Sequence, residues 1–236
     1  MSSIRALSAL LFASAAIAGT VPLAARQSNG ICGSLPQVPI SGLAAIEVWA
    51  DKTMLGYLST DVFENGPPTA YGWITYNFND ALNNVFFCGQ PGSGTVVMGA
   101  DNARTVPGTD SNAIGLVANQ WSSTMGSGNA NSAVFAPTYA SPAGMEPNST
   151  SVGSFDGSFF EGSVWTVQSG SDSAGKSHQY LIPTWVNPDG STAQLDIAVL
   201  PVQGAIEATG DFNTFYSENN YLGNWVQVKF AAAASI

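Results

Sequence analysis

The sequence contains few charged residues, only two cysteines and a single histidine. Charged residues make up 9% of the 236 positions, and His178 is the one histidine. One histidine is too few for the zinc sites that several histidines build, and no G-x-S-x-G motif marks a serine nucleophile. After the N-terminal segment, no run of eighteen apolar residues could form a transmembrane helix. The sequence therefore predicts no metal, no cofactor and no membrane span.

Basic residues are scarce as well. Sixteen acidic residues stand against six basic ones, which gives a net charge of −10 at pH 7 and an isoelectric point near 4.1. A surface of this sign repels phosphate groups. Nucleic acids and anionic membranes are therefore not expected as partners.

The N-terminal segment has the pattern of a secretory signal peptide. Arg5 precedes an apolar run over residues 6–18 that ends in the small residue Ala18. A positive charge, an apolar run and a small-residue cleavage site are the three parts of such a peptide. We expect cleavage after Ala18, because a cut after Ala25 or Arg26 would need a second processing step. The mature chain is then secreted and extracellular.

Two cysteines, Cys32 and Cys88, remain after the expected cleavage. An even number in an oxidising compartment favours one disulfide. Closing a loop of about 57 residues would stabilise the fold by roughly 4 kcal/mol in the chain-entropy description. Two buried free thiols are the alternative. The sequon at Asn148 lies in a segment rich in serine, proline and glycine, and predicts a glycosylated loop.

The expected mature chain, residues 19–236, has the length of one domain and the pattern of an all-β protein. Short apolar runs alternate with Gly, Pro, Asn or Asp at intervals of about a dozen residues. This pattern predicts an antiparallel β-sandwich or a jelly-roll-like barrel with one short helix near the C-terminus. The expected strands are 45–50, 54–59, 71–78, 85–88, 95–98, 114–120, 133–136, 158–160, 164–168, 180–187, 192–200 and 225–230.

The clearest expected strand covers residues 192–200, where apolar and polar side chains alternate. Strict alternation is typical of a strand with one face in the core and one face in water. We expect this strand to pair with residues 180–187 through a turn over 188–191. Gly190 would supply the positive φ that such a tight turn needs.

One helix is expected, directly after Asp211. Phe212, Phe215 and Tyr216 would share one face of this helix, and Asp211 is a residue type that caps helix N-termini. The pattern ends near Asn219. The helix is expected to cover one edge or end of the sheet.

Carboxylates are the remaining candidates for catalysis. A glycosidase or another acid hydrolase needs two of them facing across a cleft, with one kept protonated by apolar surroundings. Glu47, Asp156 and Glu161 are the candidates for such a pair, and Glu207 stands in the segment before the expected helix. His178 lies in a polar segment and is expected to be solvated or to stand at the entry of a strand, rather than to be catalytic.

Three of the six tryptophans, namely Trp49, Trp73 and Trp225, are expected on the more polar side of their strands. An indole in such a place can stack against a sugar ring, because it offers both apolar area and an N–H donor. The alternative is that the helix or a loop covers these side chains. Trp165 and Trp185 lie in runs that are apolar on both sides and are expected in the core.

Several strand and turn motifs follow one another along the chain. They are S-S-T at 122–124, G-S at 126–127, S-V-W at 163–165, T-W-V-N-P-D-G-S at 184–191 and T-G-D at 209–211, followed by Phe215. Their order and spacing resemble a group of small secreted fungal proteins, mostly from basidiomycetes. The resemblance implies a shared secreted β-rich domain, with no activity assigned to it and no catalytic residue to transfer.

These observations lead to three hypotheses about function. The first is an extracellular β-sandwich without enzymatic activity that binds polysaccharide, for example in a cell wall. The second is an acid-active hydrolase that uses paired carboxylates. The third is a structural surface protein without a specific ligand.

Overall fold

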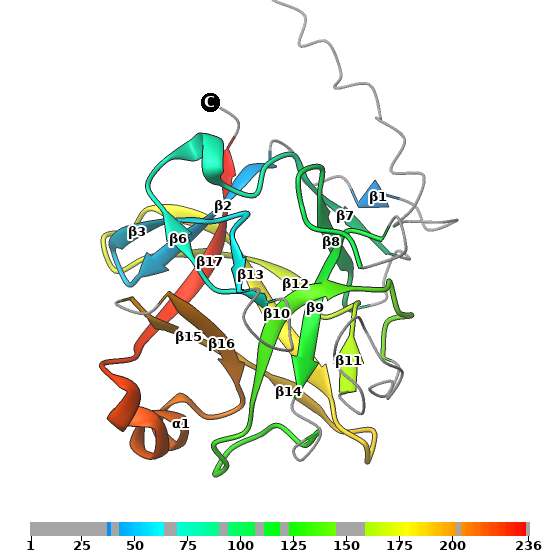
Figure 1. Ribbon diagram of the computed structural model, residues 1–236, viewed down its shortest axis with the longest axis vertical. Coiled ribbons are helices and arrows are strands. Elements are labelled where there is room, and N and C mark those ends of the chain that lie inside the picture. Colours follow the sequence, from blue (N-terminus) through cyan, green and yellow to red (C-terminus); the bar gives the residue numbers. More distant parts are fainter. Residues whose placement is uncertain are drawn as a thin grey trace, which may run out of the picture.

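The computed structural model shows an antiparallel β protein with one α-helix in the described part of the chain (Figure 1). The described residues are 37–38, 43–63, 70–89, 94–106, 111–118, 123–144, 159–201 and 204–234. The prediction of an all-β fold with a single short helix near the C-terminus is confirmed. The predicted signal peptide (1–18), Cys32, Asn148 and Asp156 lie outside the described residues.

The first sheet, sheet A, joins most strands of the middle of the chain. Its main order is β1, β7, β8, β9, β10, β16, β15, while β11 continues beside β9 and the pair β4–β5 lies beside β10. The bounds are β1 (Gln37–Val38), β4 (Val62–Phe63), β5 (Ala70–Tyr71), β7 (Val85–Cys88), β8 (Val97–Ala100), β9 (Ala113–Ala118), β10 (Ser132–Thr138), β11 (Phe159–Glu161), β15 (Asp196–Leu200) and β16 (Ala205–Thr209).

The second sheet, sheet B, combines strands from both ends of the chain. Its order is β12 (Trp165–Ser171), β13 (Ser177–Val186), β17 (Val226–Ala234), β2 (Leu43–Ala50), β3 (Thr53–Leu58) and β6 (Ile74–Thr75). The short strand β14 (Thr192–Gln194) pairs with the C-terminal end of β13. The red strand β17 runs from beside α1 to a place next to β2 (Figure 1).

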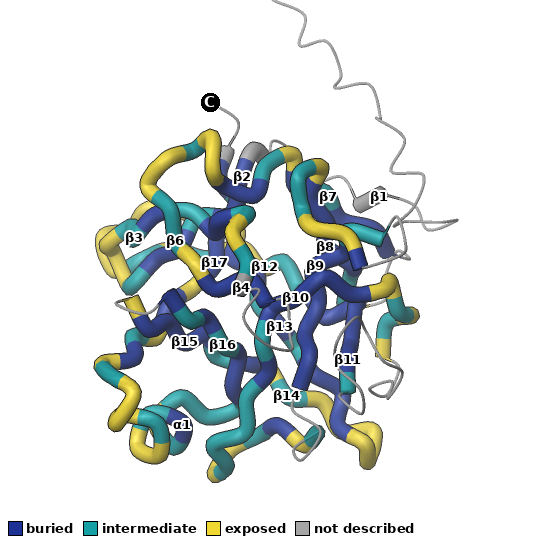
Figure 2. Tube along the Cα trace, viewed as in Figure 1, coloured by how far each residue is buried: buried dark blue, intermediate teal, exposed yellow. Residues whose placement is uncertain are grey.

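The main core lies between the two sheets, because alternate side chains of each sheet point toward the other. Phe135 on β10 of sheet A stacks on Trp165 of β12, with 5.5 Å between ring centroids, and its ring centroid lies 5.3 Å from that of Phe230 on β17. Trp165 and Trp185 are fully buried, as predicted. The strand centres are therefore buried while turns carry the exposed residues (Figure 2).

Strand β17 belongs to both sheets. Its first residues pair with β15 of sheet A, from Val226 to Val228, and its following residues pair with β2 and β13 of sheet B. The two sheets therefore diverge along β17. A strand that changes sheets in this way forms a corner of a sandwich, and side chains beside the corner lose the neighbours that a continuous sheet would supply.

The predicted hairpin over residues 180–200 is confirmed only in its first part. Gly190 has the expected positive φ of 80°, and β14 pairs with β13 as expected. At Leu195, however, the chain leaves β13, and β15 pairs with β16 and β17 instead. The inward direction of Leu195 and its alternate neighbours is correct, since they lie in the main core. The alternation of apolar residues therefore continues without a break from β14, which pairs with β13, into β15, which pairs with β16 and β17.

Two local predictions near the C-terminus had different outcomes. Helix α1 (Phe212–Asn219) begins after Asp211, whose Oδ1 accepts a hydrogen bond from the backbone N–H of Thr214 at 3.0 Å, as predicted. No strand was expected between residue 200 and the helix, but Glu207 lies there in strand β16. Two 3₁₀ turns, η1 (Phe78–Asp80) and η2 (Asn220–Leu222), complete the described helical elements.

Cys88 on β7 is fully buried, and none of the described cysteines is free. Gln37 on β1 pairs with Cys88. The predicted partner Cys32 lies outside the described residues, so the disulfide stays a prediction. Among the described residues, no helix has the length and apolar character needed to cross a membrane.

Candidate functional site

The outer face of sheet B carries a cluster of aromatic and charged side chains. Glu47 on β2 pairs with Ala231 on β17, and Ala231 pairs with Tyr180 on β13, so the three side chains point to the same side. Trp49 and Lys229 also pair with each other. They lie on the same face, because each is two residues from Glu47 or Ala231 on its own strand. Because Ala231 is small, the large side chains of β2 and β13 can approach each other over β17.

His178 lies within this cluster and is buried, with 8% of its surface exposed. Its ring meets the edge of Trp49 at 4.8 Å between centroids and stacks on Tyr180 at 5.4 Å. Of the two states expected for His178, the solvated one is wrong and the position at the entry of a strand is correct. Residues 169–179 form the ends of β12 and β13 and the turn between them, so His178 is a strand residue held between two aromatic rings.

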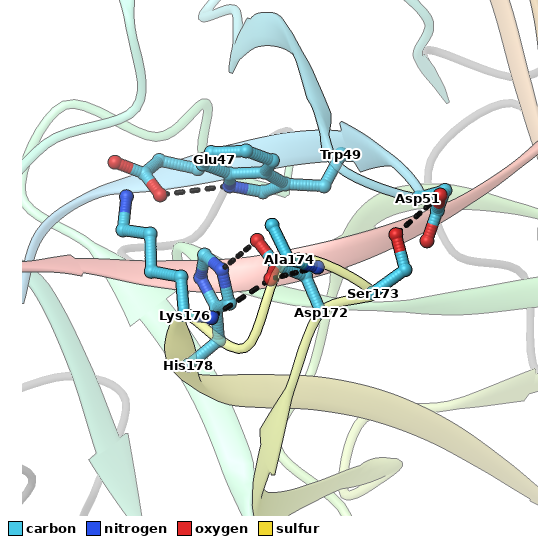
Figure 3. A network of polar contacts seen from close by, with 8 residues as sticks. All are labelled: Glu47, Trp49, Asp51, Asp172, Ser173, Ala174, Lys176 and His178. Atoms are coloured by element: carbon cyan, nitrogen blue, oxygen red, sulfur yellow. Dashed lines mark hydrogen bonds and ion pairs between the residues drawn. The ribbon is translucent and has the colours of Figure 1, made fainter.

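Asp172 holds this histidine from the turn between β12 and β13. Its Oδ2 lies 3.3 Å from Nε2 of His178, and its Oδ1 accepts the backbone N–H groups of Lys176 and Ala174 at 2.8 and 2.9 Å (Figure 3). The Lys176 N–H contributes most to a lowered pKa of Asp172, with further contributions from His178 and Ala174. The carboxylate therefore stays charged in acid and fixes both the turn and the histidine.

Two lysines place their ammonium groups over the aromatic rings of the cluster. Nζ of Lys176 lies 4.8 Å from the centroid of Trp49, and Nζ of Lys229 lies 4.8 Å from that of Tyr180. Glu47 accepts a hydrogen bond from Nε1 of Trp49 at 2.8 Å. Figure 3 shows the Lys176 side chain extending toward this Glu47–Trp49 pair. Trp49 is thus fixed at its N–H edge by Glu47, and Trp49 and Tyr180 each have a cation over one face.

A cleft of about 580 Å³, which we call the glutamine cleft, opens beside this cluster where β13, β15 and β17 diverge. Its lining includes Trp49, Tyr180 and residues of the main core. The polar residues that line it are Asp51, Gln168, Ser169, Ser171, Asp172, Ser173, Gln194, Asp196, Gln227 and Lys229. Its volume is within the range of small-molecule sites, about 300–1,000 Å³.

A second cavity of about 720 Å³, which we call the histidine pocket, adjoins the glutamine cleft. Residues 169–171 of β12 line both cavities. The histidine pocket is also lined by Glu47, Lys176, His178 and the small side chain of Ala233. The two cavities therefore meet at β12.

The predicted catalytic carboxylates do not face one another in the described part of the chain. Glu47 is on the outer face of sheet B, as shown above. Glu161 pairs with Leu116, a residue of the main core, so its side chain points to the interior of the sandwich. Glu207 pairs with Val134 and Ala198, which belong to clusters on the outer face of sheet A. Asp156 lies outside the described residues.

Two of these carboxyls are buried enough for their pKa values to rise. Burial raises the pKa of Glu161 to about 8, although the backbone N–H of Val186 donates to its Oε1 at 2.8 Å and lowers it in part. Burial also raises the pKa of Glu207, which accepts a hydrogen bond from the hydroxyl of Ser132. A raised pKa is what a catalytic acid needs. However, Glu161 and Glu207 lie on opposite faces of sheet A and cannot act as a pair.

The three tryptophans proposed as a binding platform are not brought together. Trp225 is 5% exposed, because Phe215 of α1 covers it with an edge contact at 4.9 Å. Trp73 is 39% exposed, and its ring lies against the backbone of Gly204 in the turn between β15 and β16. Trp49, at 8% exposure, borders the glutamine cleft. The alternative that the helix covers one of these faces is therefore correct for Trp225.

Sequence reasoning missed most residues of the glutamine cleft. His178, Tyr180 and Ile182 are alternate residues, so their side chains point to the same side of a strand. This alternation was a signal that the strand expected at 180–187 begins earlier, at Ser177. The three glutamines Gln168, Gln194 and Gln227 gave no such signal, because strands that are remote in sequence bring them to one cleft.

The described residues contain no group of three or more histidines, cysteines or carboxylates placed to hold a metal ion. Comparison with family models, with curated proteins and with solved structures found no match to the chain. The resemblance to small secreted basidiomycete proteins therefore stays a prediction. What the site can do must be argued from its geometry.

Proposed function

We propose that this chain is a secreted protein that binds carbohydrate in the glutamine cleft. The observation that supports this most directly is the combination of aromatic side chains with planar amide side chains around one cleft. Sugar rings bind through apolar C–H faces and through hydroxyl groups. Trp49 and Tyr180 offer the first kind of contact, and Gln168, Gln194 and Gln227 offer donors and acceptors for the second.

Secretion is part of this proposal and is supported by the N-terminal sequence. A disulfide between Cys32 and Cys88 fits the same compartment. Gln37 pairs with Cys88 and lies five positions after Cys32. Five residues span at most about 17 Å, so Cys32 is within reach of Cys88. Glycosylation at Asn148 would be expected in the same secretory route.

Hydrolysis is less well supported than binding. The carboxylates that line the glutamine cleft are Asp51, Asp172 and Asp196. Asp172, whose pKa is lowered, cannot serve as a protonated acid at moderately acidic pH. The two carboxyls with raised pKa values, Glu161 and Glu207, lie elsewhere. We therefore favour binding over turnover for this cleft.

Titration calorimetry with purified protein and soluble oligosaccharides of chitin, β-glucan and cellulose tests the proposal. Gln194 and Gln227 are exposed and can be replaced by alanine without opening the core. Loss of one hydrogen bond to a sugar hydroxyl is worth about 0.5–1.5 kcal/mol, which is about two- to tenfold in affinity. Asn213→Ala, an exposed change on α1, is the matched control and should have no effect. If Gln194→Ala and Gln227→Ala bind every oligosaccharide as wild type does, the glutamine cleft is not the site.

A further inference from the structure

The glutamine cleft and the histidine pocket together carry an excess of negative charge. The carboxylates that line them are Glu47, Asp51, Asp172 and Asp196. The basic groups are Lys176, Lys229 and His178, which pairs with Asp172, so acids outnumber bases even with a protonated histidine. The whole chain has a net charge of −10, so more distant charges do not reverse this sign. A groove lined by one sign of charge concentrates ligands of the other sign. The two cavities therefore favour a cationic ligand over a neutral one and disfavour an anionic one.

The aromatic rings of the cluster give a second, independent indication of a cation. Trp49 and Tyr180, which border the glutamine cleft, each have an ammonium group over one face, from Lys176 on Trp49 and from Lys229 on Tyr180, both at 4.8 Å. An ammonium is attracted to the negative face of an aromatic ring. Lys176 is exposed in the turn before β13, so its side chain can leave Trp49 without disturbing the core. The lysine then acts as an internal occupant that a ligand ammonium can replace.

We propose that the preferred ligand is a polymer of amino sugars with protonated amines, such as a chain of glucosamine units. This inference rests on the proposed function, since it names the class of carbohydrate for the same cavities. One amine of the ligand takes the place of the Lys176 ammonium over Trp49. The Asp51 carboxylate, which is exposed at the other side of Trp49, faces a second amine, while the glutamine side chains bind hydroxyl groups.

The proposal predicts opposite effects for two single changes. Lys176→Ala removes the internal competitor and one positive charge, so a glucosamine oligomer should bind about two- to fivefold more tightly, the range of an exposed cation–π contact. Asp51→Asn should weaken the same binding by about two- to fivefold. Asp51 has a φ of 50°, a left-handed conformation that asparagine also adopts. An asparagine can still accept the hydrogen bond that Ser173 donates to Asp51, so the turn is preserved.

The experiment compares three hexamers by titration calorimetry at pH 5.5, in low salt and in 0.3 M salt. They are hexamers of glucosamine, which is cationic, of N-acetylglucosamine, which is neutral, and of galacturonic acid, which is anionic. We expect the glucosamine hexamer to bind most tightly and to lose affinity in salt, because screening weakens exposed charge pairs. Glu218→Gln, the same change of charge on α1 outside both cavities, should leave the affinity unchanged.

Four results would overturn the inference. Equal affinity for the glucosamine and N-acetylglucosamine hexamers would show that charge does not select the ligand, and the proposed carbohydrate binding would remain. Tightest binding of the galacturonic acid hexamer, or weaker glucosamine binding by Lys176→Ala, would show that the lysines recognise an anion. Absence of binding to all hexamers, and to the β-glucan and cellulose oligosaccharides, would reject the proposed function and this inference with it.

Discussion

Replacing Glu161 by glutamine should remove much of the pH dependence of stability between about pH 5 and pH 8. Glu161 points into the sandwich interior, is 3% exposed and accepts the backbone N–H of Val186. Glutamine has nearly the same shape and keeps an oxygen that can accept this hydrogen bond. The substitution therefore removes the ionisation and leaves the packing almost unchanged.

The direction follows from the difference between the folded and unfolded pKa values. Burial raises the folded pKa of Glu161 from 4.5 to about 8, so between these two values the folded state binds more protons than the unfolded state. The free energy of unfolding must then decrease as the pH rises through this window and level off above it. The difference in pKa corresponds to a loss of the order of 4 kcal/mol. For a domain of this size, that is a decrease of about 8–16 °C in Tm.

Thermal unfolding of the wild type and of Glu161→Gln at pH 4, 5, 6, 7 and 8.5 measures this effect. The two proteins should have similar Tm values at pH 4, and the variant should be the more stable one at pH 8.5. Glu207, whose pKa is also raised, contributes a slope of the same sign to both proteins and cancels in their difference. Glu218→Gln on α1 controls for the loss of one surface charge. Parallel Tm profiles for the wild type and Glu161→Gln would refute the reasoning.

Three further changes have defined outcomes. Asp211→Ala removes the N-cap of α1 and should reduce the free energy of unfolding by about 1 kcal/mol, measured by urea unfolding; no change would mean that the cap is dispensable. In Gly170→Ala the new Cβ would lie 3.0 Å from the ring of Tyr180, so we expect the ring to shift and oligosaccharide binding to weaken; unaltered calorimetry would contradict this. Reduction of the predicted Cys32–Cys88 disulfide should cost a few kcal/mol, and an unchanged Tm after reduction would identify two thiols.

The secondary structure was largely predictable because it depends on local pattern. The alternation in residues 192–200 identified the buried side chains correctly, and the cap at Asp211 located α1. The change of sheet at Leu195 was not predictable, since the inward-facing side chains alternate in the same way on both sides of it. Pairing between sheets is set by distant strands, which a single sequence does not reveal.

The candidate site was predicted only in part. Trp49 and Glu47 were recognised from their shared parity on one strand, and they do lie on one face. His178 was missed because its polar neighbours suggested a connection, whereas its burial depends on Trp49 and Tyr180 from two strands. For Trp225 the sequence left open a binding surface or cover by the helix or a loop, and Phe215 of α1 covers it.

The shared strand β17 also constrains the order in which the molecule can be built. Trp49 on β2 and Lys229 on β17 are paired neighbours although 180 positions separate them in the sequence. During synthesis β2 and β3 therefore emerge long before the strand that lies between β2 and β13. Contacts between such distant segments slow folding, because a long loop must close before they form. Sheet B thus assembles only after β17 has been made, and until then β2 and β13 lack the strand that lies between them.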